Sequence, residues 1–213
     1  MSFLRQIFVC GMFMLPVMSL QADTASFVTG IEYQEIYPAQ NTVAPTGQIE
    51  VVELFWYGCP HCGRLEPHLK TWLKNKPANV HFVRIPAQFN KGWPLHAAAY
   101  YTAESLGLLD KMHEAFFIEI HEKHNKLSNV DQLAVFFSKF GVEREKFLKV
   151  FNSFAIKNKL AYARAVAKRY GARSVPAFVI NGKYRTNETM AGSRDAMFKV
   201  IEELVGLESS PKK

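Results

Sequence analysis

Two cysteines separated by two residues stand where the sequence changes from strand character to helix character. Residues 49–57 (IEVVELFWY) form a nearly continuous apolar, β-branched and aromatic run, which predicts a buried strand. Gly58 and the tetrad CPHC (Cys59 to Cys62) follow, and apolar residues then recur at helical spacing as far as Leu73. Because a helix accepts proline in its first turn, we expect Cys59 at the end of the strand and Cys62 one turn into a helix.

The N-terminal segment predicts that the chain is exported. Residues 6–22 carry no charge, follow Arg5 and end in the small residue Ala22, which is typical of a secretory signal peptide covering residues 1–22. A membrane anchor that is retained is the alternative, but the apolar run is short for a helix that crosses a bilayer. Cys10 lies inside this segment, and we assign it no role.

The basic residues of the chain are scattered along its length. The formal net charge is +7, but Lys and Arg form no cluster, so the sequence does not predict nucleic-acid binding. A dispersed positive charge is compatible with acidic or membrane-associated partners. Beyond the N-terminal segment no apolar run is long enough to span a membrane, and the remaining length suits one large domain or a domain with an insertion.

The middle of the chain predicts a long helical segment that follows a second strand. Residues 80–86 predict that strand, and residues 95–170 show apolar residues at helical spacing almost throughout. Ser128 and Asp131 form a pair typical of a helix start within this segment. We expect the aromatic residues here to form core rather than a cofactor site, and we expect any exposed apolar surface to lie beside Cys59.

Strand character returns near the C-terminus. Residues 175–180 predict a third strand, and Asn181 followed by Gly182 is a strong signal for a type I′ hairpin turn. A last helix is predicted over residues 193–207. The predicted order is therefore strand, helix, strand, helical segment, hairpin and helix, which indicates an α/β fold.

The cysteine pair suits redox chemistry better than a structural role. A disulfide between Cys59 and Cys62 closes a loop of only four residues and therefore restricts the unfolded chain little. Unpaired N–H groups and the dipole at the helix N-terminus favour a thiolate at Cys59, and His61 is a further candidate donor or positive charge. A stabilised thiolate favours the reduced pair, which makes the disulfide a stronger oxidant.

The same residues give weaker support to two other kinds of site, a zinc site and the active site of a cysteine hydrolase. A structural zinc site requires four ligands, and although His61 and His68 lie near the pair, no further cysteine is available outside the N-terminal segment. The sequence HEKH (residues 121–124) is one residue short of the spacing of a zinc protease. A cysteine hydrolase would use Cys59 as its nucleophile and leave Cys62 without a purpose. No metal is predicted.

The CPHC tetrad, the downstream sequence SVPAF (residues 174–178) and the helical segment between them resemble the DsbA family of bacterial periplasmic thiol:disulfide oxidoreductases. The likeness extends from about residue 31 to about residue 204. It implies an α/β, thioredoxin-like fold with an inserted all-helical domain. The predicted division is a thioredoxin-like domain of residues 23–90 and 160–213, and a helical insertion of residues 91–159.

The resemblance also assigns roles around the cysteine pair. It implies a redox-active disulfide between Cys59 and Cys62, with Cys59 as the nucleophile that forms mixed disulfides and Cys62 as its buried partner. Pro60 and His61 are the dipeptide that tunes the redox potential. Glu53 matches a buried acid beneath the cysteines; a strand residue that faces solvent is the alternative, but its apolar neighbours favour burial.

A second set of residues is expected to hold the substrate. Pro176 matches the family's cis-proline, and its loop, with Val175 before it, is expected to lie against the cysteines and to pair with the substrate backbone. Pro67 departs from the family pattern, and we interpret it as a kink in the helix with no bearing on redox chemistry.

The implied function is that of a monomeric periplasmic oxidant without a cofactor. It donates its disulfide to reduced exported proteins and is reoxidised by a membrane quinone reductase resembling DsbB. A reductase or disulfide isomerase of the same superfamily is one alternative. A chaperone that needs neither cysteine is another.

Overall fold

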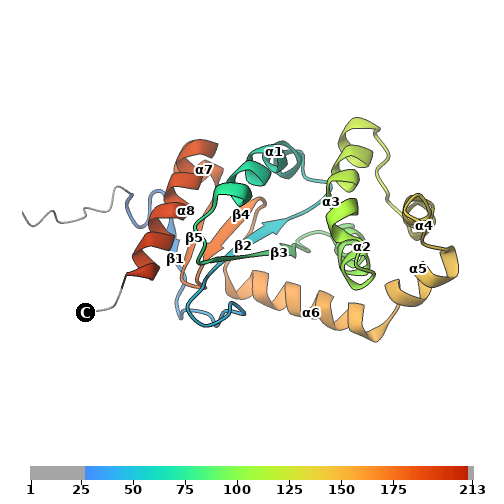
Figure 1. Cartoon of the computed structure of the whole chain (residues 1–213), viewed down its shortest axis with the longest axis horizontal. Helices are drawn as coiled ribbons and strands as arrows, with labels where there is room; N and C mark the ends of the chain where they lie inside the picture. The colour runs from blue at the N-terminus through green and yellow to red at the C-terminus, as the bar shows by residue number, and fades with distance from the viewer. Residues whose placement is uncertain (1–26, 211–213) are drawn as a thin grey trace, which may run out of the picture.

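The structure, a computed structural model, describes residues 27–210. The predicted signal peptide and Cys10 lie outside the described residues. Within the described residues, no helix is both long enough and apolar enough to cross a membrane. The predicted α/β order is confirmed, and Figure 1 shows a sheet with helices on both sides of it and a group of helices beyond one end.

The described residues contain one five-stranded sheet in the order β1-β5-β4-β2-β3. Strand β2 and the edge strand β3 are parallel, which requires the crossover helix α1, whereas β4 in the middle of the sheet runs antiparallel to both β2 and β5. The two-residue strand β1 was not predicted. The strands are β1 (Gln34–Glu35), β2 (Ile49–Phe55), β3 (Val80–Pro86), β4 (Ala177–Ile180) and β5 (Tyr184–Thr186).

The long helical segment between β3 and β4 is confirmed, and it is divided into several helices. One of its turns is a π-helix, η1, which continues α3 directly. The helices are α1 (Pro60–Asn75), α2 (Trp93–Ser105), α3 (Leu109–Phe117), η1 (Ile118–Glu122), α4 (Val130–Ser138), α5 (Arg144–Phe151), α6 (Phe154–Arg169), α7 (Glu188–Ala191) and α8 (Arg194–Ser209).

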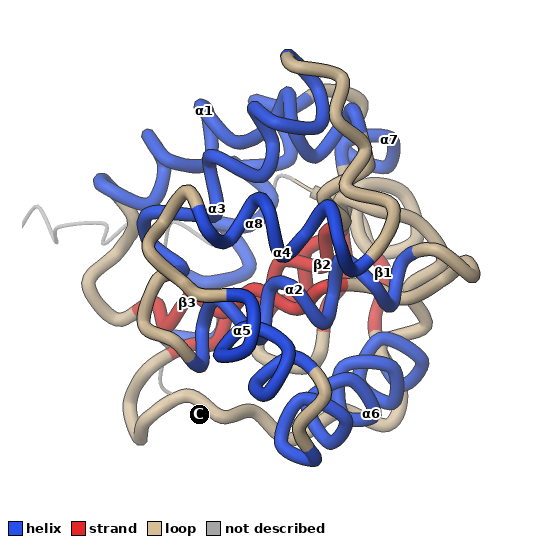
Figure 2. Tube along the Cα trace, turned by 90° about the vertical axis from the view of Figure 1, so that its right-hand side faces the viewer, coloured by secondary structure: helices blue, strands red, loops and turns tan. Residues whose placement is uncertain are grey.

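Each face of the sheet is covered by a different set of helices. Helices α1 and α8 bury one face, where Leu69 and Ile201 join Val51 in one apolar cluster. The other face, with Val52 and Val179, joins the cluster built by α2 to α6. Figure 2 shows the strands between α1 above and α6 below, so the sheet is the middle layer of three.

Two details of the helical segment differ from the prediction. Helix α4 is capped by Asn129, whose side chain accepts from the N–H of Gln132, so the cap lies one residue after Ser128. Phe154 begins α6 and is 76% exposed, although most aromatic residues of the segment are buried as expected. Helix α6 also runs across the predicted domain boundary at residue 159, and the division into domains stays a prediction.

The expectation about exposed apolar surface is wrong. Among the described residues, the large apolar side chains that are strongly exposed are scattered and none lies beside Cys59 in the sequence; they are Val28, Ile31, Tyr37, Val43, Val135, Phe154, Tyr162 and Leu207.

The predicted turn after β4 is confirmed, because Asn181 and Gly182 both have the positive φ that a type I′ turn requires.

Candidate functional site

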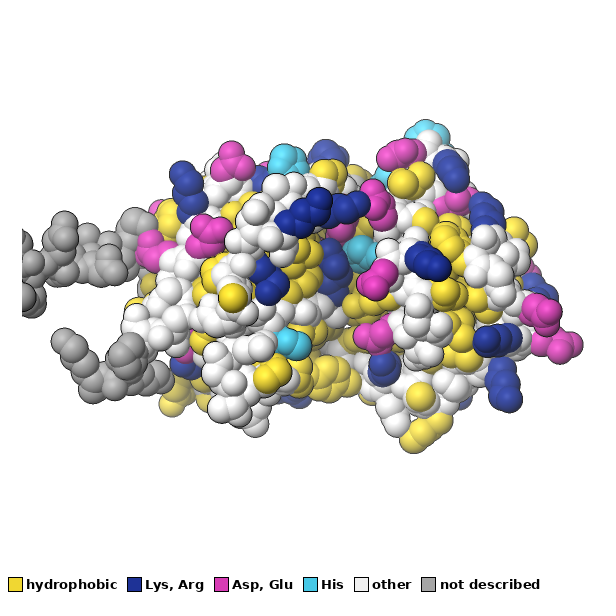
Figure 3. All heavy atoms as spheres, viewed as in Figure 1, with side chains coloured by type: hydrophobic (Ala, Val, Ile, Leu, Met, Phe, Trp, Pro, Cys, Tyr) yellow, Lys and Arg dark blue, Asp and Glu magenta, His cyan; other side chains and the backbone are white. Residues whose placement is uncertain are grey.

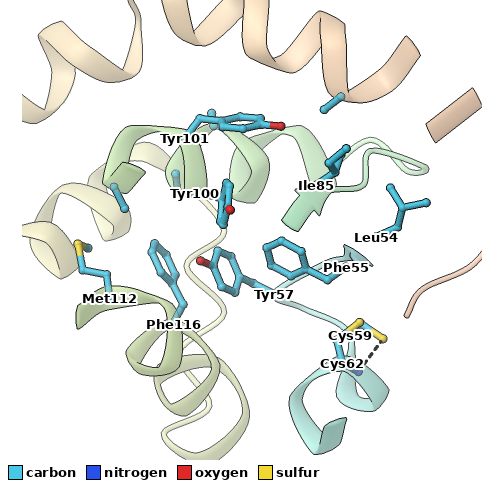
Figure 4. Close-up of a cluster of buried hydrophobic side chains, with 14 of the residues drawn as sticks. Leu54, Phe55, Tyr57, Cys59, Cys62, Ile85, Tyr100, Tyr101, Met112 and Phe116 are labelled. Carbon is cyan, nitrogen blue, oxygen red and sulfur yellow. Dashed lines mark hydrogen bonds between the residues drawn. The ribbon is translucent and has the colours of Figure 1, made fainter. Parts of the chain in front are cut away.

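The cysteine pair lies at the junction between β2 and α1. Cys59 is the N-cap of α1, and Pro60 occupies the first helical position, as predicted. The Cys59 N–H donates to the carbonyl of Trp56, which closes the turn between the strand and the helix. Cys59 is 7% exposed and Cys62 is completely buried, so Cys59 is the more accessible of the two sulfurs. Figure 4 shows them beside the aromatic cluster that contains Phe55 and Tyr57.

Several groups stabilise a thiolate at Cys59. A hydrogen bond from the Cys62 thiol is the largest cause that lowers the Cys59 pKa, to about 6, and the N–H groups of Cys62 and His61 and the charge of His61 act in the same direction. The Cys62 N–H lies 3.4 Å from Cys59 Sγ. Burial raises the pKa of Cys62 well above its ordinary value. The pair therefore combines an acidic thiol with one that resists ionisation.

The loop before β4 lies against the cysteines. The register of β4 on β2 pairs Ala177 with Leu54, which brings the start of β4 to the end of β2 where Cys59 follows. The Val175–Pro176 peptide bond is cis, as the resemblance implied. Cys59 Sγ lies 3.5 Å from the carbonyl oxygen of Val175. This contact joins residues 116 positions apart in the sequence.

Glu53 lies on β2 and is completely buried, so the alternative of a solvent-facing strand residue is wrong. Its Oε2 accepts from Arg84 Nε at 2.9 Å, while its Oε1 has no hydrogen-bond partner among the described residues. Burial raises the pKa of Glu53 to about 8, and the negative charges of Glu66 and Cys59 act in the same direction, against the opposing charge of Arg84. Burial therefore favours the protonated form of Glu53.

Arg84 begins a chain of polar contacts that was not predicted from the sequence. It also donates to Glu66, and Glu66 accepts from His113 Nε2 at 3.1 Å. His113 Nδ1 lies 2.9 Å from the hydroxyl of Tyr57. Three of these residues, Arg84, Glu66 and His113, line a cavity of about 1030 Å³ between α1 and α3, and Figure 3 shows this face of the molecule hollowed between its two halves.

A second histidine of the helical insertion also reaches the loop before Cys59. His121, in η1, donates through Nε2 to the carbonyl oxygen of Tyr57 at 2.8 Å and stacks on Phe117. Its ring also packs against Gly63 of α1, where an added Cβ would lie 3.1 Å from it. Tyr57 is thus held at its hydroxyl and at its carbonyl by residues of α3 and η1.

The remaining histidines do not gather around the cysteine sulfurs. His61 is exposed, and its Nδ1 accepts from Arg64 at 3.2 Å. His68 Nε2 lies 2.8 Å from Arg194 Nη1 of α8. Within the part of the chain that the structure describes, no three His, Cys, Asp or Glu side chains are grouped so that they could hold a metal ion.

Comparison with known proteins places this arrangement in a family. The family model for a DSBA-like thioredoxin domain matches residues 50–202, which include the CPHC tetrad, the helical insertion and the Val175–Pro176 loop. The match confirms the predicted thioredoxin-like fold. The curated relatives include the thiol:disulfide interchange protein DsbA of Pseudomonas aeruginosa, 42% identical over 196 residues that cover 92% of each chain. The DsbA of Azotobacter vinelandii is 37% identical over 200 residues, covering 94% of this chain and 93% of that protein.

Solved structures agree with the sequence comparison. The crystal structure of Pseudomonas aeruginosa DsbA superposes with a TM-score of 0.80 at 42% identity, covering 85% of this chain and 94% of that one. The oxidoreductase DsbA from Xylella fastidiosa gives a TM-score of 0.79 at 34% identity, covering 85% of this chain and 97% of that one. The junction of strand and helix that carries Cys59 and Cys62 thus lies in a fold and a sequence shared with these proteins, and the chain belongs to the DsbA family of thiol:disulfide oxidoreductases.

Proposed function

We propose that this oxidoreductase works as an oxidant, which donates a Cys59–Cys62 disulfide to reduced exported proteins. The observation that carries the proposal is the position of Cys59 as the N-cap of α1, with the Cys62 N–H 3.4 Å from its Sγ. A hydrogen bond from the Cys62 thiol and the N–H groups of the helix lower the Cys59 pKa to about 6, against about 8.5 for an unperturbed thiol. A difference of this size favours the reduced pair at neutral pH and above. By the usual conversion, it makes the disulfide more oxidising by up to about 70 mV.

The first step is attack on the enzyme disulfide. A client thiolate attacks Cys59 Sγ, the Cys59–Cys62 bond breaks, and the new bond joins the client sulfur to Cys59. The electron pair of the broken bond leaves with Cys62. Because the Cys62 pKa lies well above its ordinary value, this sulfur requires a proton as it leaves. Glu53, with a pKa raised to about 8, is the proposed proton donor, acting directly or through one water molecule.

The second step releases the client. A second client thiolate attacks the client sulfur of the mixed disulfide, and Cys59 leaves as a thiolate. A leaving thiol of low pKa leaves faster, so the acidity of Cys59 assists this step. The client has then lost two electrons and two protons and holds a disulfide. The enzyme holds the Cys59 thiolate and the Cys62 thiol.

Other residues are proposed to hold the client and to tune the pair. The Val175 carbonyl lies 3.5 Å from Cys59 Sγ, and this distance supports the proposal that the loop of Val175 and Pro176 accepts a hydrogen bond from a client N–H while the client is bonded to Cys59. Pro60 begins the helix whose N–H groups stabilise the Cys59 thiolate. His61 contributes both its N–H and its charge to that stabilisation.

The cellular setting is proposed from the family and from the sequence. We place the mature protein in the periplasm as a monomer, without a cofactor, after removal of residues 1–22. A membrane quinone reductase resembling DsbB is the proposed reoxidant. The proposed domains are a thioredoxin-like domain of residues 23–90 and 160–213 and a helical insertion of residues 91–159.

The redox equilibrium of the pair tests the proposal. The full mature chain is equilibrated in mixtures of reduced and oxidised glutathione, and its ability to form disulfides in a reduced, unfolded secretory protein is measured. We expect a disulfide more oxidising than that of a typical reductant and stoichiometric transfer of it to the client. Cys59→Ser and Cys62→Ser should both abolish net transfer. A pair that stays oxidised under strongly reducing mixtures would identify a reductase, and activity retained by both variants would identify a chaperone.

A further inference from the structure

A separate cavity adjoins the cysteine pair on the side of the helical insertion. Its volume is about 410 Å³, and Gly58 and Pro60, the two neighbours of Cys59 in the sequence, both line it. Trp56, Leu95 and Ile120 add half-buried apolar walls from the loop after β2, from α2 and from η1. None of the strongly exposed apolar side chains among the described residues lines it, so apolar surface next to Cys59 is recessed here.

The position of this cavity puts it within reach of a client chain bonded to Cys59. A disulfide bond is about 2 Å long, and an extended chain advances about 3.3–3.6 Å per residue, so a residue one or two places from the client cysteine reaches a wall formed by Gly58 and Pro60. The loop that carries Val175 already contacts Cys59 Sγ through the Val175 carbonyl oxygen. A client that passes Val175 and continues over Pro60 therefore reaches the wall of the cavity that Gly58 and Pro60 form.

The lining indicates which client side chain fits. The walls are apolar and partly aromatic, and a pocket of this size accepts one large apolar side chain, as interface anchors commonly do. The exposed residues Lys126 and Ser128 line it as well, from the loop between η1 and α4. Lys126 supplies a positive charge that complements a carboxylate. The Lys126 carbonyl is itself fixed, because His96 Nε2 lies 3.2 Å from it.

We propose that this cavity is a client subsite, which receives a large apolar side chain one or two positions from the reacting cysteine and favours an acidic residue beside that side chain. The inference rests on the proposed function, since it specifies the preferred clients of the same reaction. The subsite is lined by Gly58 and Pro60 of the thioredoxin-like part and by Leu95, Ile120 and Lys126 of the helical insertion, so both parts of the protein contribute to client selection.

Short dithiol peptides test the subsite. The oxidised full chain is mixed with peptides that carry Ala, Leu or Trp at the two positions on each side of one cysteine, and the rate constant of disulfide transfer is measured. Reduced glutathione, which has no large apolar side chain beside its cysteine, is the reference thiol. We expect Leu and Trp to accelerate transfer about tenfold over Ala, on one side of the cysteine only. A Glu next to the Leu should give a further acceleration of a few fold at low salt.

Two variants assign the effect to the cavity. Ile120→Trp fills it and should reduce the ratio of the Leu and Ala rates to about one, while the rate with glutathione stays within about twofold of wild type. Lys126→Glu, at an exposed position, should reverse the preference for the acidic peptide. Lys146→Glu on α5 makes the same charge change at another exposed position of the helical insertion and should leave both preferences unchanged.

The outcomes separate this inference from the proposed function. Equal rates for the Ala, Leu and Trp peptides in the wild-type protein, or an unchanged ratio in Ile120→Trp, would overturn the subsite while leaving the oxidant intact. If the Lys126→Glu variant still prefers the acidic peptide, Lys126 is not part of the subsite. Failure to transfer a disulfide to any peptide or to glutathione would instead contradict the proposed function.

Discussion

His121 Nε2 donates to the carbonyl oxygen of Tyr57 across 2.8 Å, and this bond ties the helical insertion to the loop that ends at Cys59. The Tyr57 hydroxyl contacts His113 Nδ1 of the same insertion, and its ring stacks on Phe116 with a centroid distance of 4.3 Å. The loop is therefore fixed from the insertion side as well as from the sheet.

Loss of the His121 hydrogen bond should weaken this attachment. We expect His121→Leu to lower the free energy of unfolding by about 1–2 kcal/mol, because the Tyr57 carbonyl loses its partner. His121→Gln, which keeps a donor, should recover part of the loss. Urea unfolding of the reduced protein measures both. His124→Asn, three residues on at an exposed position with positive φ, is the control and should change stability little. Equal effects of Leu and Gln would show that packing, not the hydrogen bond, matters.

Glu53→Gln should slow reduction of the enzyme disulfide by a dithiol peptide at least about tenfold at pH 7, since the amide cannot protonate Cys62. The deficit should shrink as pH rises through about 8, where the wild-type carboxyl also loses its proton. Rapid mixing over a range of pH measures the ratio of the two rates. Glu50→Gln removes another buried carboxyl of β2 and is the control. A ratio that does not depend on pH would exclude the proton-donor role.

His61→Ala should raise the Cys59 pKa by less than one unit. The substitution removes the His61 charge but keeps the backbone N–H, and the hydrogen bond from the Cys62 thiol, which is the largest cause of the low pKa, is unaffected. The ultraviolet absorbance of the thiolate, followed during titration of the reduced protein, gives the value. A Cys59 pKa that returns to about 8.5 would mean that His61 dominates.

The stability of the reduced form should depend on pH in a way that the oxidised form does not share. Folding lowers the Cys59 pKa to about 6 from about 8.5 in the unfolded chain. The thiolate therefore adds stability as pH rises above about 6, by up to about 1.4 kcal/mol per pH unit, and stops adding near 8.5. Below about 6 this contribution is lost.

Urea unfolding of both redox forms checks this prediction. Between about pH 5.5 and 8.5, the unfolding free energy of the reduced form should gain about 3 kcal/mol on that of the oxidised form. Groups that titrate alike in both forms, such as Glu50, cancel in the difference. Cys59→Ser should remove the gain. A difference that stays flat over this range would contradict an acidic Cys59.

Gly58→Ala should destabilise the protein by about 1–3 kcal/mol, because its Cβ would lie 2.3 Å from the ring of Trp56. That ring cannot move freely, since it stacks on Trp93 at a centroid distance of 4.3 Å. Gly92→Ala is the matched control, with no atom within 4 Å of the added Cβ. Thermal or urea unfolding measures both. Equal stability of the two variants would show that Trp56 can be displaced at little cost.

The strands and the helix that carry the cysteines were predictable because local pattern determined them. The apolar run of β2 and the proline at the start of α1 identify the junction, and the turn at Asn181 identifies the hairpin. Strand β1 was not predicted, because its two residues are exposed and show no alternation. The exposure of Phe154 was not predicted either, since helical spacing does not reveal which stripe faces solvent at the first turn of α6.

The site was only partly predictable. Burial of Glu53 followed from its apolar neighbours, but its partner Arg84 lies on another strand, and only the parallel register pairs the two. A charged residue inside the apolar strand of residues 80–86 was the available signal. His113 and His121 contact Tyr57 in the loop before Cys59 only because tertiary packing brings their helical segment there, which the sequence does not reveal. The contribution of the Cys62 thiol to the Cys59 pKa likewise depends on side-chain geometry.

The contact between Cys59 and Val175 also bears on the order in which the protein becomes active. The residues are 116 positions apart, and β4 can pair with β2 only after every helix from α2 to α6 has been passed along the chain. Closing so long a loop is entropically costly and is slow in folding. A chain that emerges from its N-terminus presents the CPHC helix long before the loop proposed to bind the client. We therefore expect the Cys59 thiol to be present in the growing chain before the proposed substrate site is complete.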